Sequence, residues 1–132
     1  MESDPTLTLD WATGEPVYEQ IARQIRSRIA AGDLAPGTAL PPVRTMASDL
    51  GVNLNTVARA YRQLEEQGFV LIRDRAGAVV AAPAEAPDAA LLEKLRQELR
   101  DVVQRMRQAG VAPEELRLLV DAVVAPADRA PR

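Results

Sequence analysis

A stretch of polar side chains at helical spacing holds the residues of this chain that are best suited to chemistry. They are Asn53, Asn55, Thr56, Arg59 and Arg62. Amide, hydroxyl and guanidinium groups of this kind hydrogen bond to the edges of DNA bases and to phosphates. The 132 residues include no cysteine and no histidine, which excludes disulfides, most zinc sites and the Cys-His and Ser-His-Asp nucleophiles. These side chains are therefore suited to binding a partner through hydrogen bonds and charge.

Local signals around these side chains predict two helices joined by a very short turn. Pro42 can open the first helix, since a proline at the first helical position has no amide to leave unpaired. Gly51 follows its last apolar residue, where a left-handed cap costs least without a Cβ. Asn53 can then cap a second helix. The predicted buried faces comprise Val43, Met46, Ala47 and Leu50, then Val57, Ala60, Tyr61 and Leu64.

A small β-hairpin is expected directly after this helix pair. Gly68 ends the second helix, the run from Phe69 to Arg73 forms one strand, and residues 78–81 form the other around a polar tip at residues 74–77. Such an order is that of a winged helix-turn-helix, in which the second helix enters the major groove of DNA. A structural corner of an all-α protein is the alternative, but the arginine-tipped hairpin and the amide-rich helix start favour DNA binding.

The segment before the motif is expected to complete its core. A helix is predicted from Pro16 to about Ala31, with Tyr18, Ile21, Ile25 and Ile29 as its buried stripe. Leu7 and Leu9 alternate with threonines and predict a short edge strand, and Trp11 is expected to cover a margin of the core.

Several collinear blocks resemble the N-terminal domain of the GntR transcription regulators. They are PVYEQI from Pro16, GDLAPG from Gly32, LPPVRTMA from Leu40, GVNLNTV from Gly51 with ARAY after it, and LEEQGFV from Leu64. The resemblance runs from about Leu7 to Val80, and the blocks together are far more specific than any one of them. The asparagines that start the second helix, the Arg59-Ala60-Tyr61 run and the short C-terminal region are similar to the small YtrA-like subgroup.

The resemblance and the helix positions together assign roles in DNA binding. Arg44 matches an arginine with which the family binds DNA, and it can reach a phosphate or a guanine edge; a solvated surface arginine is the alternative. Asn53 is expected to be a cap more than a base reader. Arg59 is the best candidate for a bidentate guanine contact, and Arg62 is expected to serve a phosphate. The remaining residues expected to contact bases or phosphates are Asn55 and Thr56.

The predicted wing departs from the pattern of the family. Where its relatives have a Gly-x-Gly-Thr-aromatic-Val wing, this chain has RAGAVV from Arg75, without one glycine, the threonine and the aromatic residue. Contact between the wing and DNA then depends on Arg75, through electrostatics, and on Gly77. Leu54 stands where many larger members carry a DNA-contacting arginine, so their base preferences do not transfer.

Residues 84–132 are expected to form a helical dimerisation region after an alanine- and proline-rich linker at residues 81–88. One helix is predicted over about 88–109, from an Asp88 cap to Gly110, and another over 113–124. Two helices of this size enclose too little surface for a core of their own, so a symmetric dimer is expected ahead of a core helix in a monomer. The predicted interface, which includes a heptad seam, is Leu92, Leu95, Leu99, Val102, Met106, Leu116, Leu119 and Val123.

Charge is distributed unevenly along the chain. The net charge of −3 divides into −4 for residues 1–15, +2 for residues 16–83 and −1 for residues 84–132. The basic excess lies with the helix-turn-helix but is small, so affinity is expected to depend on dimerisation and on individually placed arginines.

The sequence thus predicts a mainly α fold with a small β-wing: a winged helix-turn-helix in residues 1–83 and two dimerisation helices in residues 84–132. The predicted function is a dimeric repressor that binds an inverted-repeat operator in double-stranded DNA. The alternative is a protein-interaction module that has lost specific DNA binding. An enzyme would need carboxylate or lysine chemistry, and Lys94 lies on a predicted solvated helix face. No cofactor or metal is expected, and no effector can be named. The acidic start and the lack of a long apolar stretch predict a cytoplasmic protein without membrane contact.

Overall fold

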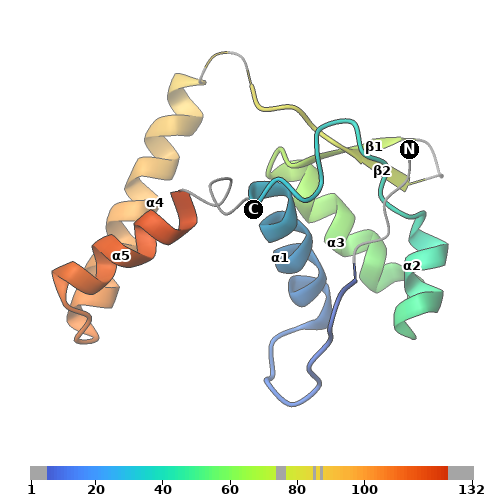
Figure 1. The fold of residues 1–132 in the computed structure, drawn as a ribbon, viewed down its shortest axis with the longest axis horizontal. Coiled ribbons are helices and arrows are strands. Elements are labelled where there is room, and N and C mark those ends of the chain that lie inside the picture. Colours follow the sequence, from blue (N-terminus) through green and yellow to red (C-terminus); the bar gives the residue numbers. More distant parts are fainter. Residues whose placement is uncertain (1–5, 74–76, 85, 87, 125–132) are drawn as a thin grey trace, which may run out of the picture. The chain divides into compact units, whose positions relative to one another are not determined.

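The computed structural model describes residues 6–73, 77–84, 86 and 88–124, and the chain divides into two compact units, residues 1–83 and 84–132. The described residues form five helices and two strands (Figure 1). In the first unit these are α1 (Val17–Ala30), α2 (Val43–Leu50), α3 (Leu54–Glu66), β1 (Val70–Arg73) and β2 (Gly77–Val80). In the second unit they are α4 (Ala89–Gln108) and α5 (Pro113–Val124). The predicted fold class, mainly α with a small wing, is confirmed.

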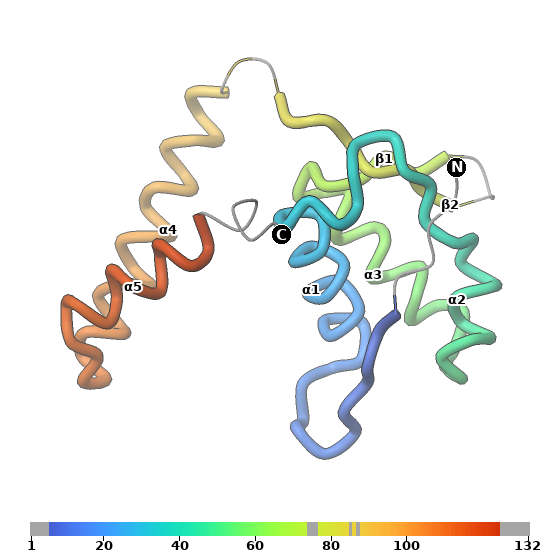
Figure 2. Tube along the Cα trace, in the orientation of Figure 1, coloured from blue at the N-terminus to red at the C-terminus, as the bar shows by residue number. Residues whose placement is uncertain are grey.

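The turn between α2 and α3 follows the local chemistry of its residues. Gly51 adopts the left-handed conformation with a φ of 70°, and its amide donates to the carbonyl groups of Ala47 and Ser48. Asn53 accepts a hydrogen bond of 2.7 Å from the amide of Asn55 through its side-chain oxygen. The glycine stops one helix and the asparagine starts the next, so α2 and α3 are held at a fixed angle (Figure 2).

Two prolines lie one residue outside the positions predicted for them. Pro16 and Pro42 are N-cap residues with ψ angles of 144° and 150°, rather than the first residues of α1 and α2. Each still accepts the first hydrogen bond of its helix, as in the 3.0 Å bond from the amide of Met46 to the carbonyl of Pro42. An extended ψ at the cap therefore begins the helix one residue later.

The core of the first unit lies between α1, α3, α2 and the inner face of the hairpin. All four residues predicted for the buried face of α3 are buried, as are Ile21 and Ile25 of α1. The hydroxyl of Tyr61 donates a 2.7 Å hydrogen bond to the carbonyl of Pro41, which satisfies the polar end of a fully buried ring. The fixed polar contact ties α3 to the segment that leads into α2.

The N-terminal segment was predicted as an edge strand, and that prediction is wrong. Leu7 and Leu9 pack against the core in extended backbone without a strand ladder. Side-chain hydrogen bonds replace those that a neighbouring strand would make. The Gln24 side-chain amide donates to the Thr8 carbonyl at 2.8 Å and accepts from the Thr8 backbone amide at 3.0 Å. The Gln20 side chain forms the same two hydrogen bonds with the backbone of Asp10. Amide side chains on α1 thus satisfy the backbone that a neighbouring strand would otherwise satisfy.

Trp11 does not cover the core as predicted, because its side chain is 70% exposed.

The hairpin is antiparallel, with Val70 opposite Val80 and Arg73 opposite Gly77. Ala39 forms a bridge to Val79, so the segment before α2 flanks the second strand. The wing is consequently attached to the helix-turn-helix by backbone hydrogen bonds.

The second unit contains two helices with little burial, and α4 is capped at both ends. Asp88 accepts hydrogen bonds from the amides of Ala90 and Leu91, as predicted for the N-cap of α4. Leu116 is the one buried residue among residues 88–124. No helix in the described parts of the chain has the length and apolar character needed to cross a bilayer.

Candidate nucleic-acid interface

The outward face of α3 presents the polar side chains that the sequence predicted for recognition. Asn55, Arg59 and Arg62 are exposed and Thr56 is half-buried, whereas the opposite face is completely buried in the core. Asn53 is exposed but holds the start of the helix through its cap, which agrees with the predicted role. Leu54, at the first position of α3, is 42% exposed and adds an apolar surface to this end. The first turn of α3 is therefore free to meet a ligand.

Arg59 does not extend freely into solvent but lies against α1. Its guanidinium carbon is 3.8 Å from the centroid of the Tyr18 ring, and its Nη2 donates a 3.2 Å hydrogen bond to the Tyr18 hydroxyl. Tyr18, predicted for the buried stripe of α1, is half-buried, and its contact with Arg59 is not predicted by the sequence. The two residues are 41 positions apart, and nothing in their local spacing joins them.

A second contact joins the same two helices one turn further along α3. Gln63 donates a 3.0 Å hydrogen bond from its amide nitrogen to the Glu19 carboxylate. Gln20, the next residue of α1, is 2% exposed and donates to the carbonyl groups of Asp10 and Glu15. The first turn of α1 is consequently anchored in the core while it contacts the outer face of α3.

The other arginines predicted to bind DNA lie on the surface of the first unit. Arg44 is exposed in the first turn of α2, and Arg62 is exposed on α3. Neither forms an ion pair within the described residues, in contrast to Arg23, whose Nη2 lies 2.9 Å from a carboxylate oxygen of Glu15. That hydrogen-bonded guanidinium holds the pKa of the Glu15 carboxyl below its ordinary value. The arginines without a carboxylate partner remain available to an external anion.

The two wing residues predicted to contact DNA are Arg75 and Gly77, and that contact stays a prediction. Arg75 lies outside the described residues. Gly77 is buried, with a φ of 134°, and an added Cβ would lie 3.2 Å from the Cα of Pro42. A close backbone approach thus accounts for the glycine, which presents no side chain to a ligand.

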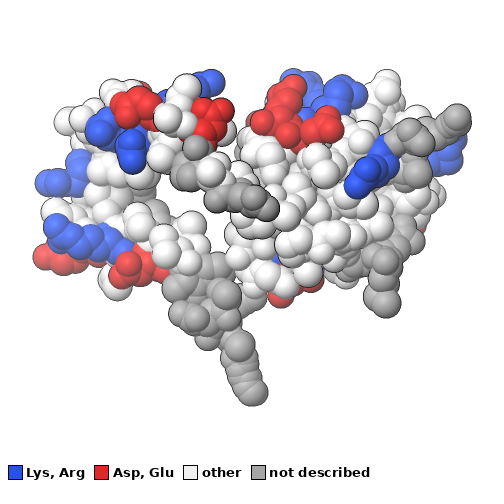
Figure 3. Space-filling view, turned by 90° about the horizontal axis from the view of Figure 1, so that it is seen from above, with Lys and Arg blue, Asp and Glu red and all other residues white. Residues whose placement is uncertain are grey.

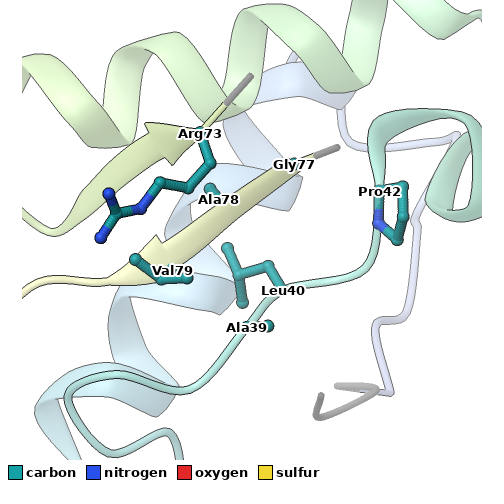
Figure 4. Close-up of a pocket in the computed structure, with 7 residues that line it drawn as sticks. All are labelled: Ala39, Leu40, Pro42, Arg73, Gly77, Ala78 and Val79. Carbon is teal, nitrogen blue, oxygen red and sulfur yellow. The ribbon is translucent and has the colours of Figure 1, made fainter. Parts of the chain in front are cut away.

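A shallow hollow of about 270 Å³ lies where the wing meets the segment before α2 (Figure 4). Its walls are mainly aliphatic, and Arg73 contributes its one charged side chain. The lining residues are Ala39, Leu40, Pro42, Arg73, Gly77, Ala78 and Val79.

Figure 3 shows basic and acidic side chains interspersed on the visible face rather than gathered in one basic field.

Comparison with known proteins identifies the class of this surface. Residues 17–80 match the model of the family described as bacterial regulatory proteins, gntR family. Over 114 residues the chain is 30% identical to the HTH-type transcriptional repressor YtrA of Bacillus subtilis (strain 168), which covers 83% of this chain and 85% of that relative. The chain belongs to the GntR family. It is a transcriptional regulator with a DNA-binding helix-turn-helix, and its relatives place it with the YtrA-like members.

Two solved structures resemble this GntR regulator over nearly their whole length. YtrA from Sulfolobus acidocaldarius, a GntR-family transcription factor, is 36% identical, with a TM-score of 0.64 over 77% of this chain and 97% of that one. A transcriptional antiterminator from Listeria monocytogenes EGD-e is 28% identical, with a TM-score of 0.77 over 93% and 96%. The second likeness includes both units of the GntR chain.

The second unit of this GntR protein exposes most of the residues predicted for a dimer interface. Leu95, Leu99 and Val102 of α4 are 48%, 59% and 42% exposed. Leu92 and Met106 are half-buried. On α5, Leu119 and Val123 are exposed, whereas Leu116 is already buried within the chain. Within the predicted set, Leu116 is therefore buried, Leu92 and Met106 are half-buried, and the remaining residues are uncovered.

Proposed function

We propose that this GntR regulator is a homodimeric repressor that binds an inverted-repeat operator through α3. The observation that carries the proposal is the exposed polar face of α3, whose first turn projects from a closed core. In a helix-turn-helix, the N-terminal residues of the second helix contact base edges in the major groove. The similar Bacillus subtilis protein YtrA is a transcriptional repressor, which supports the repressor activity.

Within this proposal the exposed side chains have separate roles. Arg59 reads a guanine through a bidentate contact, Asn55 and Thr56 contact bases or phosphates, and Arg62 contacts a phosphate. Arg44 contacts the backbone or a guanine from the first turn of α2. Electrostatic support from Arg75 at the wing tip completes the proposed surface.

Dimerisation is supported by the uncovered apolar faces of α4 and α5. Contiguous exposed apolar surface is typical of association sites, and two-fold pairing places two α3 helices against two half-sites. The proposed interface consists of the exposed residues Leu95, Leu99, Val102, Leu119 and Val123, with Leu92 and Met106 at its margin. Leu116 is buried within the single chain and is not part of this exposed set.

Selection of binding sites from a random duplex pool tests the proposal directly. The expected result is an inverted repeat with half-site centres one turn of DNA apart, or a multiple of that spacing. Arg59→Ala should then weaken binding to the selected site by about 1 to 3 kcal/mol, with a smaller effect on random DNA. Arg62→Ala should weaken binding to both DNAs alike.

The outcomes separate this function from its alternative. Selection of a single half-site without its inverted copy, together with a monomer in light scattering at micromolar concentration, would contradict the dimeric repressor. Failure to select any sequence at low salt would favour a protein-interaction module instead. The atypical wing sequence and the small positive charge are the features that favour that second function.

A further inference from the structure

Tyr18 of α1 holds Arg59 of α3, the side chain proposed to read a base. We propose that Tyr18 is a positioning residue that keeps Arg59 of α3 oriented for reading a base; this inference rests on the function proposed above. The ring, whose centroid is 3.8 Å from the guanidinium carbon, and the hydroxyl, 3.2 Å from Nη2, restrain the guanidinium at two points. A long flexible side chain is thereby restricted before DNA arrives.

The geometry restrains Arg59 without using up its capacity to bind. A guanidinium has five N–H donors, and the tyrosine hydroxyl accepts from one nitrogen. The ring lies under the guanidinium carbon and takes up none of the other N–H donors. Enough donors are left for a bidentate contact with the O6 and N7 acceptors of guanine.

The neighbouring residue shows why a neutral partner matters. Glu19 follows Tyr18 in the first turn of α1, yet its carboxylate accepts a hydrogen bond from the neutral amide of Gln63. The cation is thus held by the neutral ring, and the acid by a neutral amide. A carboxylate on Arg59 would compete with DNA for the same N–H groups, whereas a ring leaves the positive charge intact.

The part of α1 that carries Tyr18 is anchored in the core of the first unit. Gln20, two residues later, is buried and bonded to Asp10 and Glu15, and Ile21 and Ile25 anchor the helix in the core. The ring therefore keeps its place when the first turn of α3 meets a ligand. This stability distinguishes a positioning residue from one that merely fills space at the helix surface.

The test compares the full-length wild-type protein with Tyr18→Leu, Tyr18→Phe, Arg59→Ala and the Tyr18→Leu/Arg59→Ala double variant. Affinity is measured on the selected operator and on operators in which each base pair of the half-site is changed in turn. Tyr18→Leu should weaken operator binding about three- to tenfold, as expected for loss of a cation–π contact, and lose discrimination at the base pair that Arg59→Ala identifies. The double variant should bind no worse than Arg59→Ala alone.

Matched controls separate positioning from a structural role. Tyr18→Phe keeps the ring and should retain most of the discrimination. Glu19→Gln alters the adjacent contact to Gln63 and should leave base preference unchanged. Equal losses on operator and random DNA for Tyr18→Leu, adding to those of Arg59→Ala, would overturn the proposal and indicate a separate phosphate or structural contact.

A measurement without DNA keeps this inference distinguishable from the proposed function. In the free protein, NMR relaxation of the Arg59 Nε–H group should show greater mobility in Tyr18→Leu than in the wild type. Unchanged mobility overturns the positioning role whatever the protein binds. Restricted mobility in the wild type with no selected DNA sequence would overturn the proposed function while the restraint itself stands.

Discussion

The two units of this regulator differ in how completely each one buries its own apolar side chains. The first unit encloses residues of three helices and a hairpin, and Ile21, Val57 and Leu64 have no measurable exposure. The second unit leaves most of its leucines and valines uncovered, although α4 is well capped. The difference shows that good helix signals and a folded core are separate properties. The first unit encloses a core of its own, whereas the second leaves the apolar surface on which the proposed dimerisation rests.

The largest expected effect comes from a cavity in the first unit. Leu64→Ala should lower the free energy of unfolding by about 2 to 5 kcal/mol, because a fully buried leucine leaves a void behind. Urea denaturation at two protein concentrations measures it, and the loss should be the same at both. Leu99→Ala in the second unit should instead have an effect that changes with concentration. If Leu64→Ala and Leu99→Ala lowered the free energy of unfolding equally at both protein concentrations, the two units would not differ in this way.

A charge on the uncovered face of α4 should affect association without unfolding the first unit. Leu99→Asp is expected to give a monomer in light scattering and to weaken operator binding more than about tenfold, since the two half-sites are no longer held by one molecule. Gln104→Asp, which places the same charge elsewhere on the exposed surface of α4, is the control and should remain dimeric. A dimeric Leu99→Asp variant would place the interface elsewhere.

The two helix caps should behave alike locally and differently in their consequences. Asn53→Ala and Asp88→Ala each remove a side-chain acceptor from a helix start and should cost about 1 kcal/mol. Asn53→Ala should lower the temperature at which the first unit unfolds. Asp88→Ala should weaken dimerisation, as measured by sedimentation. Asn53→Ser, which restores the acceptor, should recover the stability.

The smallest expected effect concerns the exposed pair of Glu15 and Arg23. The pKa of Glu15 is lowered in the folded protein because Arg23 donates hydrogen bonds to its carboxylate. Its contribution to stability is therefore present above the unfolded pKa and is lost as the pH falls through the folded pKa. An NMR titration should show the Glu15 midpoint rise in Arg23→Gln. Because both side chains are well exposed, the gain in stability at neutral pH should be slight.

Much of the fold could be predicted because its signals lie within a few residues of one another. Gly51, Asn53 and the spacing of Val57, Ala60 and Tyr61 each specify local geometry, and the structure confirms them. The contact between Tyr18 and Arg59 could not be predicted, because the packing of α1 on α3 creates it.

The same limit explains the errors near the N-terminus. Leu7 and Leu9 have the alternation of a strand, but glutamine side chains satisfy their segment, a pairing that no local pattern reports. Trp11 was assigned from its apolar character alone. DNA contact by Gly77 stays a prediction; the close approach of its backbone to Pro42 is a second role that the sequence could not reveal.

The segment before α2 is held on three sides. The amide of Leu40 donates a 2.7 Å hydrogen bond to the Ala78 carbonyl, the Tyr61 hydroxyl bonds to Pro41, and Gly77 lies against Pro42. Hairpin, α2 and α3 are thus joined without a hinge between them. For protein engineering, this makes residues 7–83 a transplantable cassette: fused to an unrelated dimeric scaffold, it should carry its own base preference with it, while the scaffold alone determines the spacing of the half-sites.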